Sequence, residues 1–454
     1  MTQRSAPIAI TTALVAGAVS GTALAQWDPG NGSWGKVNPT DIRVMTWNVE
    51  DMLRTENPLK GDQLSNWNAC SRIVAGLRPD VLILQETGDN GCGGCVDSVS
   101  ELETVVGLFF NGGADPFVGG TVTTFVKRFA PDYDLPFVFV SAVNDGFNRN
   151  VILSRFPFAD LNGDGIATNP DLFVLADAYA PTGSTIRGQA FAEIDLPDSV
   201  YEGDLVVGNA HFKAGGTSSD RADRLAASQS IAYAIDYMFN GAGTGISDPN
   251  NKILFPNPSS VLPDNTPVVW GGDWNEDELT NGRKGPAEWM TRAQFTGGTD
   301  GTDRDRGDST YDDARDPFTN SRNTRSSSKL DYLAWQDSIV EGVPLQFVFN
   351  SISVDAVDQL PEPVRGFPSS GELASVFASD HFPVIVDLSL PLATPGGCNE
   401  ADLAEAFGVL DLSDINAFTT AFVSQDDAGD LDANGIFDLA DINLFVNAFV
   451  AGCP

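Results

Sequence analysis

The 454-residue chain contains only two histidines, His211 and His381. Imidazole titrates near neutral pH and is the usual proton carrier in enzymes, so any such role here falls to these two residues. His211 lies in the segment Asn-Ala-His-Phe-Lys over residues 209–213, and His381 lies in Ser-Asp-His-Phe-Pro over residues 379–383. Each segment adjoins a run of valine, isoleucine and leucine that is typical of a β-strand, so both imidazoles are expected at strand ends.

Carboxylate and amide side chains stand at the ends of the other strand-like runs. A single aspartate or asparagine at such a position is a common turn former. Six such sites spread through the chain, however, favour a shared role over coincidence. Besides the two histidines, the residues at these sites are Asn48, Glu86, Asn209, Asp273, Asn275, Asp331 and Asp380.

Together these residue types match the needs of phosphodiester hydrolysis. The reaction requires an activated water, a cation that spreads the charge on the phosphate oxygens, and help for the leaving group. A carboxylate–histidine pair, an oxygen-rich cation site and amide donors would meet these three needs. Hard oxygen ligands in an open site suit Mg²⁺ or Mn²⁺.

The elements that must position these residues are many strands and few helices. Helical patterns are expected over residues 63–77 and 219–239. Such a mixture favours mixed sheets packed face to face with helices outside, rather than one doubly wound parallel sheet. The strand-like runs are residues 42–47, 81–85, 137–141, 151–154, 190–194, 205–209, 268–270, 330–335, 345–349 and 384–388.

From Arg43 to Leu388 these segments resemble the motifs of the endonuclease/exonuclease/phosphatase superfamily, in the order usual for that family. The superfamily includes pancreatic-type deoxyribonuclease, abasic-site endonucleases, inositol-phosphate phosphatases and bacterial sphingomyelinases. The resemblance implies an α/β (α+β) fold, a four-layer sandwich of two packed mixed β-sheets flanked by helices, with the site at one end.

The resemblance also implies a role for each residue. Glu86 would bind the catalytic metal, and Asn48 and Asp380 would help to hold the metal or the phosphate. His381 would act as the general acid/base, and Asp331 would orient it and stabilise the imidazolium.

The remaining residues would serve the water and the phosphate. Asp273 and Asn275 would position the attacking water and stabilise the charged oxygens, and Asn209 and His211 would contact the phosphate. Some members of the superfamily carry a tyrosine in place of His211. The histidine here therefore leans toward the deoxyribonuclease and sphingomyelinase branches.

A local group of basic residues precedes Asp331 in an otherwise acidic chain. Arg325 and Lys329 are candidate phosphate contacts, although solvated loop charges would give the same pattern. The group comprises Arg315, Arg322, Arg325 and Lys329, and weaker candidates of the same kind are Arg149, Arg187 and Lys213.

The composition bears on environment more than on chemistry. The net charge of −36, from 62 acidic and 26 basic residues, does not favour long-range attraction to nucleic acid or to an anionic membrane. No internal apolar run approaches the ~20 residues of a membrane span. Residues 1–25 combine a basic start, an apolar stretch and a terminal Ala-Leu-Ala, which indicates a cleaved signal peptide and a secreted or cell-surface attached protein.

Composition and repeats divide the remaining chain into three parts. The sequence predicts a catalytic domain over residues 26–389, a linker over 390–397 and a small domain over 398–454. Within the first part, residues 88–129 are an insertion expected to form a lid or wall near Glu86. A second insertion, residues 160–171, fits a calcium-loop template, although a polar turn would look similar.

The five cysteines suggest disulfides in an exported protein. Cys398 and Cys453 bracket the small domain and are expected to join its ends. Cys92 and Cys95 could form a local bridge, a redox dithiol or half of a metal site, and the structural bridge is favoured. Cys70 falls in a helical stretch and is expected to be buried.

The small domain contains a repeat with a period of 27 residues, since residues 410–418 match residues 437–445. The second copy fits a calcium loop followed by a helix, whereas in the first copy the early ligand positions are degraded or shifted toward Asn399 and Asp402. The domain resembles dockerin-type modules, which implies an all-α, calcium-binding adaptor for a surface or scaffold partner; the alternative is a calcium-stabilised tail without a partner. The Ca²⁺ ligands would be Asp430, Asp432, Asn434, the Ile436 carbonyl, Asp438 and Asp441.

The leading hypothesis is therefore a secreted, divalent-metal-dependent phosphoesterase that cleaves phosphodiester bonds of nucleic acid and docks through its last domain. The alternatives are a phosphatase, a sphingomyelinase-like phospholipid phosphodiesterase, or a non-catalytic surface binding protein. A membrane-active enzyme would need exposed aromatic residues, for which Phe109, Phe110 and Phe117 are candidates. The complete motif set counts against the non-catalytic alternative.

Overall fold

The computed structural model describes residues 27–91, 95–159, 173–175, 189–198, 200–240, 262–263, 265–281, 286–287, 309–393, 398–404, 407–431 and 436–453. Several features predicted from the sequence lie outside these residues. They are the signal peptide, the loop 160–171, Cys92, Arg187, Asp432 and Asn434.

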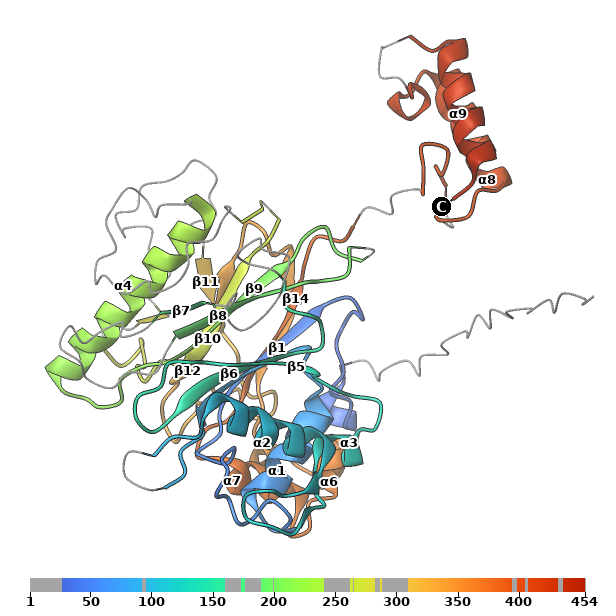
Figure 1. Ribbon diagram of the computed structural model, residues 1–454. Helices are drawn as coiled ribbons and strands as arrows, with labels where there is room; N and C mark the ends of the chain where they lie inside the picture. Colours follow the sequence, from blue (N-terminus) through green and yellow to red (C-terminus); the bar gives the residue numbers. More distant parts are fainter. Residues whose placement is uncertain are drawn as a thin grey trace, which may run out of the picture.

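Two mixed sheets form the centre of the larger unit, residues 27–393 (Figure 1). The strands of the first sheet are β1 (Ile42–Asn48), β2 (Val81–Thr87), β5 (Phe137–Val140), β6 (Arg149–Ser154), β13 (Gly342–Val348) and β14 (Val384–Ser389). Their order is β13-β14-β1-β2-β6-β5. The pair β1 and β2 is parallel, and the other neighbours are antiparallel.

The second sheet has a similar plan. Its strands are β7 (Phe173–Leu175), β8 (Gln189–Ile194), β9 (Leu205–His211), β10 (Val268–Asp273), β11 (Ser309–Tyr311) and β12 (Asp331–Gln336). The order is β11-β12-β10-β9-β8-β7. Among the described pairs of this sheet, β9 and β10 are parallel and the other neighbours are antiparallel. A separate short hairpin joins β3 (Gly113–Ala114) and β4 (Thr121–Val122).

Alternation of side chains along each strand builds two faces of core. On β1, Ile42 and Val44 point into the core between the sheets, whereas Met45 and Trp47 point into the core beneath the helices. Every residue of β1 is buried, which is expected for a strand covered on both faces. The sequence therefore specifies a central strand with no solvent-facing side.

Helices cover the outer face of each sheet (Figure 1). α4 (Ser218–Asn240) covers the second sheet, and its Ala227 and Ile231 join the core cluster of β9 and β10. The first sheet is covered by α1 (Asn66–Leu77), α2 (Val99–Asn111), α3 (Val126–Phe129), α6 (Glu362–Arg365) and α7 (Ala374–Ala378). The predicted four-layer sandwich of two mixed sheets flanked by helices is thus confirmed. Short 3-10 helices lie at Pro29–Asn31 (η1), Ser351–Ser353 (η4), Val357–Gln359 (η5) and Gly371–Leu373 (η6).

The first insertion, expected to be a lid or wall, contributes mainly to the outer helical layer. Its helix α2 buries Leu102, Val105 and Phe109 against the core beneath the helices, where Phe109 packs edge to face on Trp67 at 5.3 Å between ring centroids. Phe110 is likewise only 2% exposed. These aromatic residues are therefore core residues and do not offer a membrane-contacting surface.

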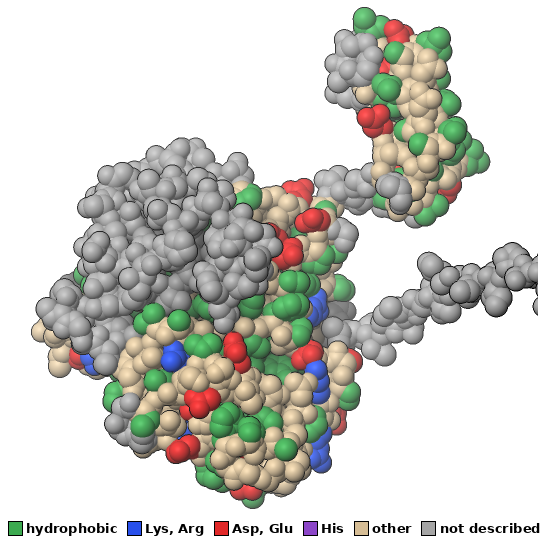
Figure 2. Space-filling model, in the orientation of Figure 1, with side chains coloured by type: hydrophobic (Ala, Val, Ile, Leu, Met, Phe, Trp, Pro, Cys, Tyr) green, Lys and Arg blue, Asp and Glu red, His purple; other side chains and the backbone are tan. Residues whose placement is uncertain are grey.

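The smaller unit, residues 398–453, pairs two helices from the two repeats. These are α8 (Leu412–Ser424) and α9 (Leu439–Ala451), and the short 3-10 helix η7 (Asp427–Gly429) lies between them in the chain. Phe418 and Phe445, which are equivalent in the repeat, stack at 4.2 Å between ring centroids and form the centre of its core. Hydrophobic side chains also remain exposed along both helices (Figure 2).

The cysteine predictions are supported where the residues are described. Cys398 and Cys453 form a disulfide with a Cα–Cα distance of 5.3 Å, and Cys95 is also disulfide-bonded. Cys70 is free and fully buried on α1. Burial raises the pKa of its thiol well above the ordinary value, so Cys70 is a core residue and a poor nucleophile.

Gly272 in β10 gives a test of how tightly the second sheet is built. Its φ is +141°, and a Cβ atom there would lie 1.7 Å from the main-chain oxygen of Ala210. We expect Gly272→Ala to lower the free energy of unfolding by more than ~3 kcal/mol, because both backbone strain and a clash oppose the methyl group. Urea unfolding followed by tryptophan fluorescence reports this unit, since all eight tryptophans precede residue 390.

Gly107→Ala is the matched control. Gly107 lies within α2, and a Cβ atom there would meet nothing within 4 Å. This substitution should raise the free energy of unfolding by about 1 kcal/mol through helix propensity. Similar effects of the two alanines would contradict the strand geometry at Gly272.

Candidate active site

The second sheet places three of the predicted residues side by side. Asp273 on β10 is the register partner of His211 on parallel β9 and of Asp331 on antiparallel β12. All three side chains are at most 2% exposed. Strand pairing alone therefore places Asp273 between Asp331 and His211 at one end of the sheet.

The first sheet supplies the facing residues. Asn48 ends β1, Glu86 lies near the end of β2, and His381 precedes β14. The two sheets thus meet in one cluster of side chains, as the sequence predicted.

The carboxylate of Asp273 is the centre of this cluster. Its Oδ2 accepts a hydrogen bond from Asn48 Nδ2 at 3.0 Å and lies 3.4 Å from His211 Nε2 and 3.7 Å from His381 Nε2. Burial raises the pKa of Asp273 to about 7, an effect that the charge of His381 opposes and the carboxylate of Asp331 strengthens. Asp273 is therefore a carboxylate that can exchange a proton near neutral pH.

His381 and Asp331 form a carboxylate–histidine pair. Asp331 Oδ2 lies 2.8 Å from His381 Nδ1, so the imidazole directs Nε2 toward Asp273. Burial of the imidazole disfavours its charge, but the carboxylates of Asp331 and Asp273 outweigh burial and raise the pKa of His381 to about 10. His381 is accordingly an imidazolium at neutral pH, able to donate a proton.

Glu86 is aimed at the cluster by an irregularity in β2. The pairing of β2 with β6 shifts register between Leu84 and Thr87, and Glu86 has a left-handed φ of 53°. Its carboxylate is 26% exposed and lies 3.7 Å from His211 Nε2. Ligand atoms of Glu86, His211 and Asp273 all lie within 4.8 Å of one another, a donor set that fits a hard divalent cation with one side open to solvent.

Two acids that the motif analysis missed join the rim. Glu50 donates its main-chain N–H to Asn48 Oδ1 at 3.1 Å, and its Oε2 accepts from the main-chain N of Asp380 at 3.1 Å. Burial, helped by the charge of Glu86, raises the pKa of Asp51 to about 6 against a hydrogen bond from Asn148. Their only signal in the sequence is that they directly follow Asn48.

Asp380, a predicted metal ligand, stands at the exposed edge of the site. Its side chain is 38% exposed, its Oδ1 lies 3.9 Å from His381 Nε2, and its other oxygen pairs with Arg325. It is not among the groups whose ligand atoms already converge with Glu86. Coordination by Asp380 would therefore compete with its ion pair to Arg325.

Asn209 and Asn275 occupy different depths. Asn209 is fully buried behind His211, where its amide donates to the carbonyls of Leu84 and Val151 and accepts from Gln85, each at 2.8–2.9 Å. It bridges the two sheets, and its amide is engaged by these buried contacts rather than open to a phosphate.

Asn275 lies nearer the surface. Its main-chain N–H donates to Asp273 Oδ1 at 2.9 Å, and its Nδ2 donates to the carbonyl of Phe212 at 3.1 Å. With a φ of 53° it turns sharply out of β10, so the segment after Asp273 folds back on β9.

The basic residues before Asp331 are matched by acids. Lys329 is 1% exposed, pairs with Asp312 and lies 4.8 Å from the ring centroid of Tyr332, so it is a core residue and not an open phosphate contact. Arg325, 44% exposed and paired with Asp380, remains at the rim. The other pairs are Arg315 with Asp313, and Arg322 with Asp277 and Glu278.

Thr324 holds both members of the carboxylate–histidine pair. Its Oγ1 accepts hydrogen bonds from the main-chain N–H groups of Leu330 at 2.9 Å and Asp331 at 3.1 Å. Its carbonyl accepts from the main-chain N–H of Phe382, the residue after His381, at 2.7 Å. Thr324 is fully buried, so the segments that carry Asp331 and His381 are fixed to one residue.

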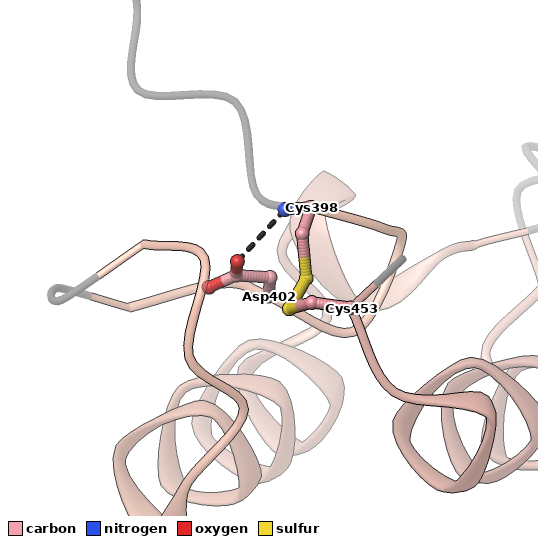
Figure 3. A group of neighbouring side chains, drawn as sticks. All are labelled: Cys398, Asp402 and Cys453. Atoms are coloured by element: carbon pink, nitrogen blue, oxygen red, sulfur yellow. Dashed lines mark hydrogen bonds between the residues drawn. A yellow bond between two sulfur atoms is a disulfide. The ribbon is translucent and has the colours of Figure 1, made fainter. Parts of the chain in front are cut away.

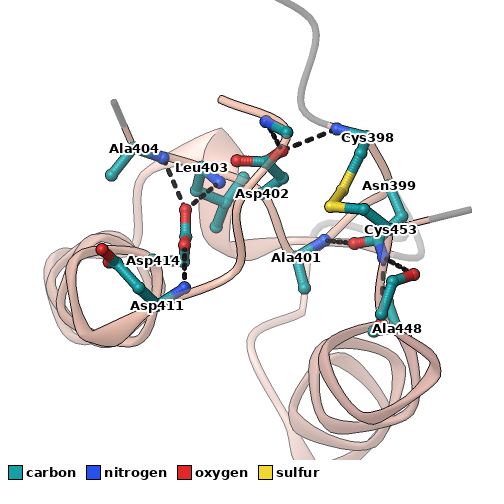
Figure 4. The surroundings of a disulfide bond; sticks show 12 residues. Cys398, Asn399, Ala401, Asp402, Leu403, Ala404, Asp411, Asp414, Ala448 and Cys453 are labelled. Carbon is teal, nitrogen blue, oxygen red and sulfur yellow. Dashed lines mark hydrogen bonds between the residues drawn. A yellow bond between two sulfur atoms is a disulfide. The ribbon is translucent and has the colours of Figure 1, made fainter. Parts of the chain in front are cut away.

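In the smaller unit, main-chain N–H groups donate to the acids of the first repeat. Asp414 accepts from the main-chain N–H groups of Leu403, Ala404 and Asp411 at 2.8–2.9 Å (Figure 4). Asp402 accepts from the main-chain N–H of Cys398 at 2.7 Å, beside the disulfide (Figure 3). Main-chain donors thus hold the carboxylates of this loop.

The second repeat keeps the acids of the template. Asp441, equivalent to Asp414, is fully buried and accepts from the main-chain N–H of Asp438 at 2.9 Å. Asp438 in turn caps α9 through the N–H of Ala440. Asp430 and Ile436 are described, whereas the predicted ligands Asp432 and Asn434 are not.

Comparisons with known proteins give only distant likenesses. No protein-family model matches the chain, and no curated protein sequence matches it. Among solved structures it resembles an endonuclease/exonuclease/phosphatase from Beutenbergia cavernae (17% identity, TM-score 0.37, covering 77% of this chain and 72% of that one). It also resembles the human Nocturnin catalytic domain with bound sulfate (12%, 0.40, 77% and 95%) and sphingomyelinase C from Streptomyces griseocarneus (14%, 0.36, 76% and 99%).

These scores do not assign the chain to a family, so its chemistry rests on the geometry of its own residues. Among the described residues, no helix combines the length and apolarity needed to span a membrane.

Thr324→Val tests the clamp on the carboxylate–histidine pair. Valine keeps the shape but leaves two buried N–H groups without an acceptor, which should cost about 1–3 kcal/mol of stability. Because Asp331 then loses its fixed position, the pKa of His381 should fall from about 10 toward its ordinary value. NMR titration of the metal-free protein can follow it, since the chain has only two imidazoles.

Thr324→Ser is the control, because it retains the hydroxyl oxygen and should keep the pKa of His381 near the wild-type value. If Thr324→Val lost stability while the His381 titration stayed unchanged, Thr324 would be a structural residue without influence on the pair.

Proposed function

We propose that the chain is an exported, divalent-metal-dependent phosphoesterase that hydrolyses phosphodiester bonds, with nucleic acid as its substrate. The observation that carries this proposal is the buried Asp273 carboxylate, which lies between two imidazoles and beside the partly open carboxylate of Glu86. This arrangement combines a base, an acid and cation ligands within one cluster.

The cation would be held by Glu86 together with Asn48 and, at the rim, Asp380. Carboxylate and amide oxygens at a partly hydrated site favour Mg²⁺ or Mn²⁺. When bound, the cation would offset negative charge on the phosphate oxygens.

The protein side chains would carry the protons. Asp273 takes a proton from the attacking water, whose oxygen forms the new bond to phosphorus as the ester P–O bond breaks. His381, an imidazolium at neutral pH, gives its proton to the leaving oxygen while Asp331 keeps Nδ1 in place. His211 and Asn275 stand beside Asp273 and would donate hydrogen bonds to the phosphate oxygens.

Nucleic acid is the first candidate substrate because the site would accept a phosphodiester and Arg325 stands exposed at its rim. The other basic residues before Asp331 are paired with acids, and the body of the protein is acidic. Both features weaken the attraction of the protein to long duplexes. Short or single-stranded substrates therefore suit the surface better than long double-stranded ones.

A phospholipid head group is the second candidate, favoured by one apolar patch. Ile352, Leu373, Val376 and Phe377 are 38–56% exposed on η4, η6 and α7, and α7 leads directly into Asp380 and His381. Reciprocal hydrogen bonds between Ser351 and Ser375 fix η4 against α7. Such a patch beside the site could contact the acyl region of a lipid substrate.

We further propose that the smaller unit binds one Ca²⁺ in its second repeat and docks on a surface or scaffold partner. The acids kept in that repeat support the first part. Paired exposed residues support the second, because the same repeat positions are apolar and at least 36% exposed on both halves. The pairs are Val409 and Ile436, Leu412 and Leu439, Ile415 and Ile442, and Val423 and Val450.

Hydrolysis by the mature protein, residues 26–454, tests the catalytic proposal. We expect chelator-sensitive turnover of bis-(p-nitrophenyl) phosphate and nicking of plasmid DNA with Mg²⁺ or Mn²⁺. His381→Ala and Glu86→Ala should each lower turnover by about 100-fold or more, because they remove the acid and a cation ligand. Turnover only on sphingomyelin vesicles would select the second candidate substrate.

Glu341→Ala is the matched control, since Glu341 is exposed next to the end of β13 that pairs with the far end of β14. It should keep wild-type turnover. Activity that survives both His381→Ala and Glu86→Ala would reject this site.

Calcium binding is tested by a pair of equivalent substitutions. Asp438→Asn removes a proposed ligand charge, whereas Asp411→Asn makes the same change in the first repeat; asparagine still caps a helix well at both positions. We expect Ca²⁺ to slow hydrogen exchange of the α9 peptide in the wild type and in Asp411→Asn. In Asp438→Asn the Ca²⁺ concentration required should rise about tenfold or more. Equal responses of the two variants would contradict a site confined to the second repeat.

A further inference from the structure

A pocket adjoins the catalytic cluster on the side of α4. Its volume is about 510 Å³, and its lining includes Gly215, Gly216, Arg221, Asn275, Asn281 and Ser328. Asn275 belongs to both the pocket and the site, because its N–H holds Asp273 Oδ1 at 2.9 Å. A group bound in this pocket would therefore be the immediate neighbour of a group bound at Asp273.

Most charges of the pocket wall are already matched. Arg224 pairs with Glu276 and donates to the carbonyls of Lys213 and Gly215, with a side chain only 3% exposed. Asn281 also donates to Glu276, at 2.5 Å. On the other side, Asp277 pairs with Arg322 at 3.0 Å. These contacts build a rigid wall of little net charge.

Arg221 is the exception among the described lining residues. Its side chain is 55% exposed, and its Nε lies 3.9 Å from Glu276 Oε1. Glu276 is already engaged by Arg224 and Asn281, so its charge is shared among three donors. Arg221 can therefore turn to a new anion without leaving a buried acid unpaired.

Lys213 does not line the pocket but lies beside it, because its carbonyl accepts a hydrogen bond from the lining residue Arg224. Its side chain is 49% exposed and lies 3.9 Å from Asp220, whose carboxylate already accepts from the N–H and hydroxyl of Thr217. The intervening Gly215 has a φ of +116°, and a side chain at Gly216 would meet nothing within 4 Å. The loop between the two cations thus presents open backbone at Gly216, whereas the Asp220 carboxylate lies against Gly215.

We propose that this pocket binds a second phosphate of the substrate, next to the phosphate that is cleaved. Arg221 and Lys213 would contact this phosphate, since guanidinium and ammonium groups are the usual protein ligands of phosphate. Each of the two cations lies 3.9 Å from a carboxylate that other donors also engage. The inference rests on the proposed phosphodiesterase function and narrows its substrate to chains with at least two phosphates. It also supplies the phosphate contacts that the buried Lys329 does not make.

A pair of short substrates separates this subsite from the chemistry. The dinucleotide TpT has one phosphodiester group, and TpTpT has two. We expect the wild type to prefer TpTpT, and Arg221→Gln to lower the ratio of kcat/KM for TpTpT to that for TpT by about tenfold, the loss of one charged hydrogen-bonded contact. Lys213→Gln should lower the same ratio in the same direction.

Lys127→Gln is the control, because Lys127 on α3 is a partly exposed cation paired with Asp134 in the helical layer of the first sheet. It should leave the ratio at the wild-type value. A ratio that Arg221→Gln changes no more than Lys127→Gln does would overturn the subsite.

A binding measurement keeps the subsite testable if turnover fails. Fluorescence anisotropy with a labelled oligothymidylate should show about tenfold weaker binding to Arg221→Gln, and a slope of log affinity against log salt that is shallower by about 0.7. Absence of turnover together with this loss of binding would reject the phosphodiesterase proposal and retain the subsite. Equal affinity and equal salt dependence in wild type and variant would reject the subsite itself.

Discussion

The burial of the Asp273 carboxylate between the two sheets is the constraint on which the site depends. An isolated carboxylate in this position would cost several kcal/mol, so it persists only with partners in contact. Those partners come from both sheets, since Asn48 and His381 belong to the first and His211 to the second. These contacts therefore fix the position of one sheet relative to the other at this end of the sandwich. Asn209 adds a second polar tie across the same gap, through carbonyls of β2 and β6.

Local backbone strain serves the same end. Four of the eight described non-glycine residues with positive φ, namely Glu50, Asp51, Glu86 and Asn275, stand around the cluster. Such conformations cost of order 1 kcal/mol or more each and survive only where the surroundings fix them. Here they allow chains leaving β1, β2 and β10 to turn at once, so that their side chains face inward. The bulge that shifts the register of β2 against β6 has the same consequence for Glu86.

Strand positions were predictable from the sequence because their apolar periodicity is strong, and so was the meeting of Asn48, Glu86, Asp273 and the histidines at strand ends. What the sequence could not give is the pairing of charges, which depends on side chains far apart in the chain. The sequence predicts Lys329 as a candidate phosphate contact, yet Asp312 and Tyr332 enclose its side chain in the core. Glu50 carries no motif and enters the site only through the turn after β1. The position of helix α2 likewise depends on the whole fold, because the first sheet needs apolar cover on its outer face.

In the smaller unit both repeats share one capping contact, since the main-chain N–H groups of Asp411 and Asp438 donate to Asp414 and Asp441 respectively. In the first repeat, Asp414 takes three main-chain N–H groups, and the disulfide restricts the unfolded chain, a stabilisation of about 2–4 kcal/mol. In the second repeat the equivalent Asp441 lies in a loop that keeps its acidic residues. Both repeats orient their helix so that Phe418 and Phe445 stack. The exposed apolar positions are equivalent on the two halves. Because the same acid is held at the start of the following helix in both repeats, the apolar positions of α8 and α9 are presented equivalently on the two halves.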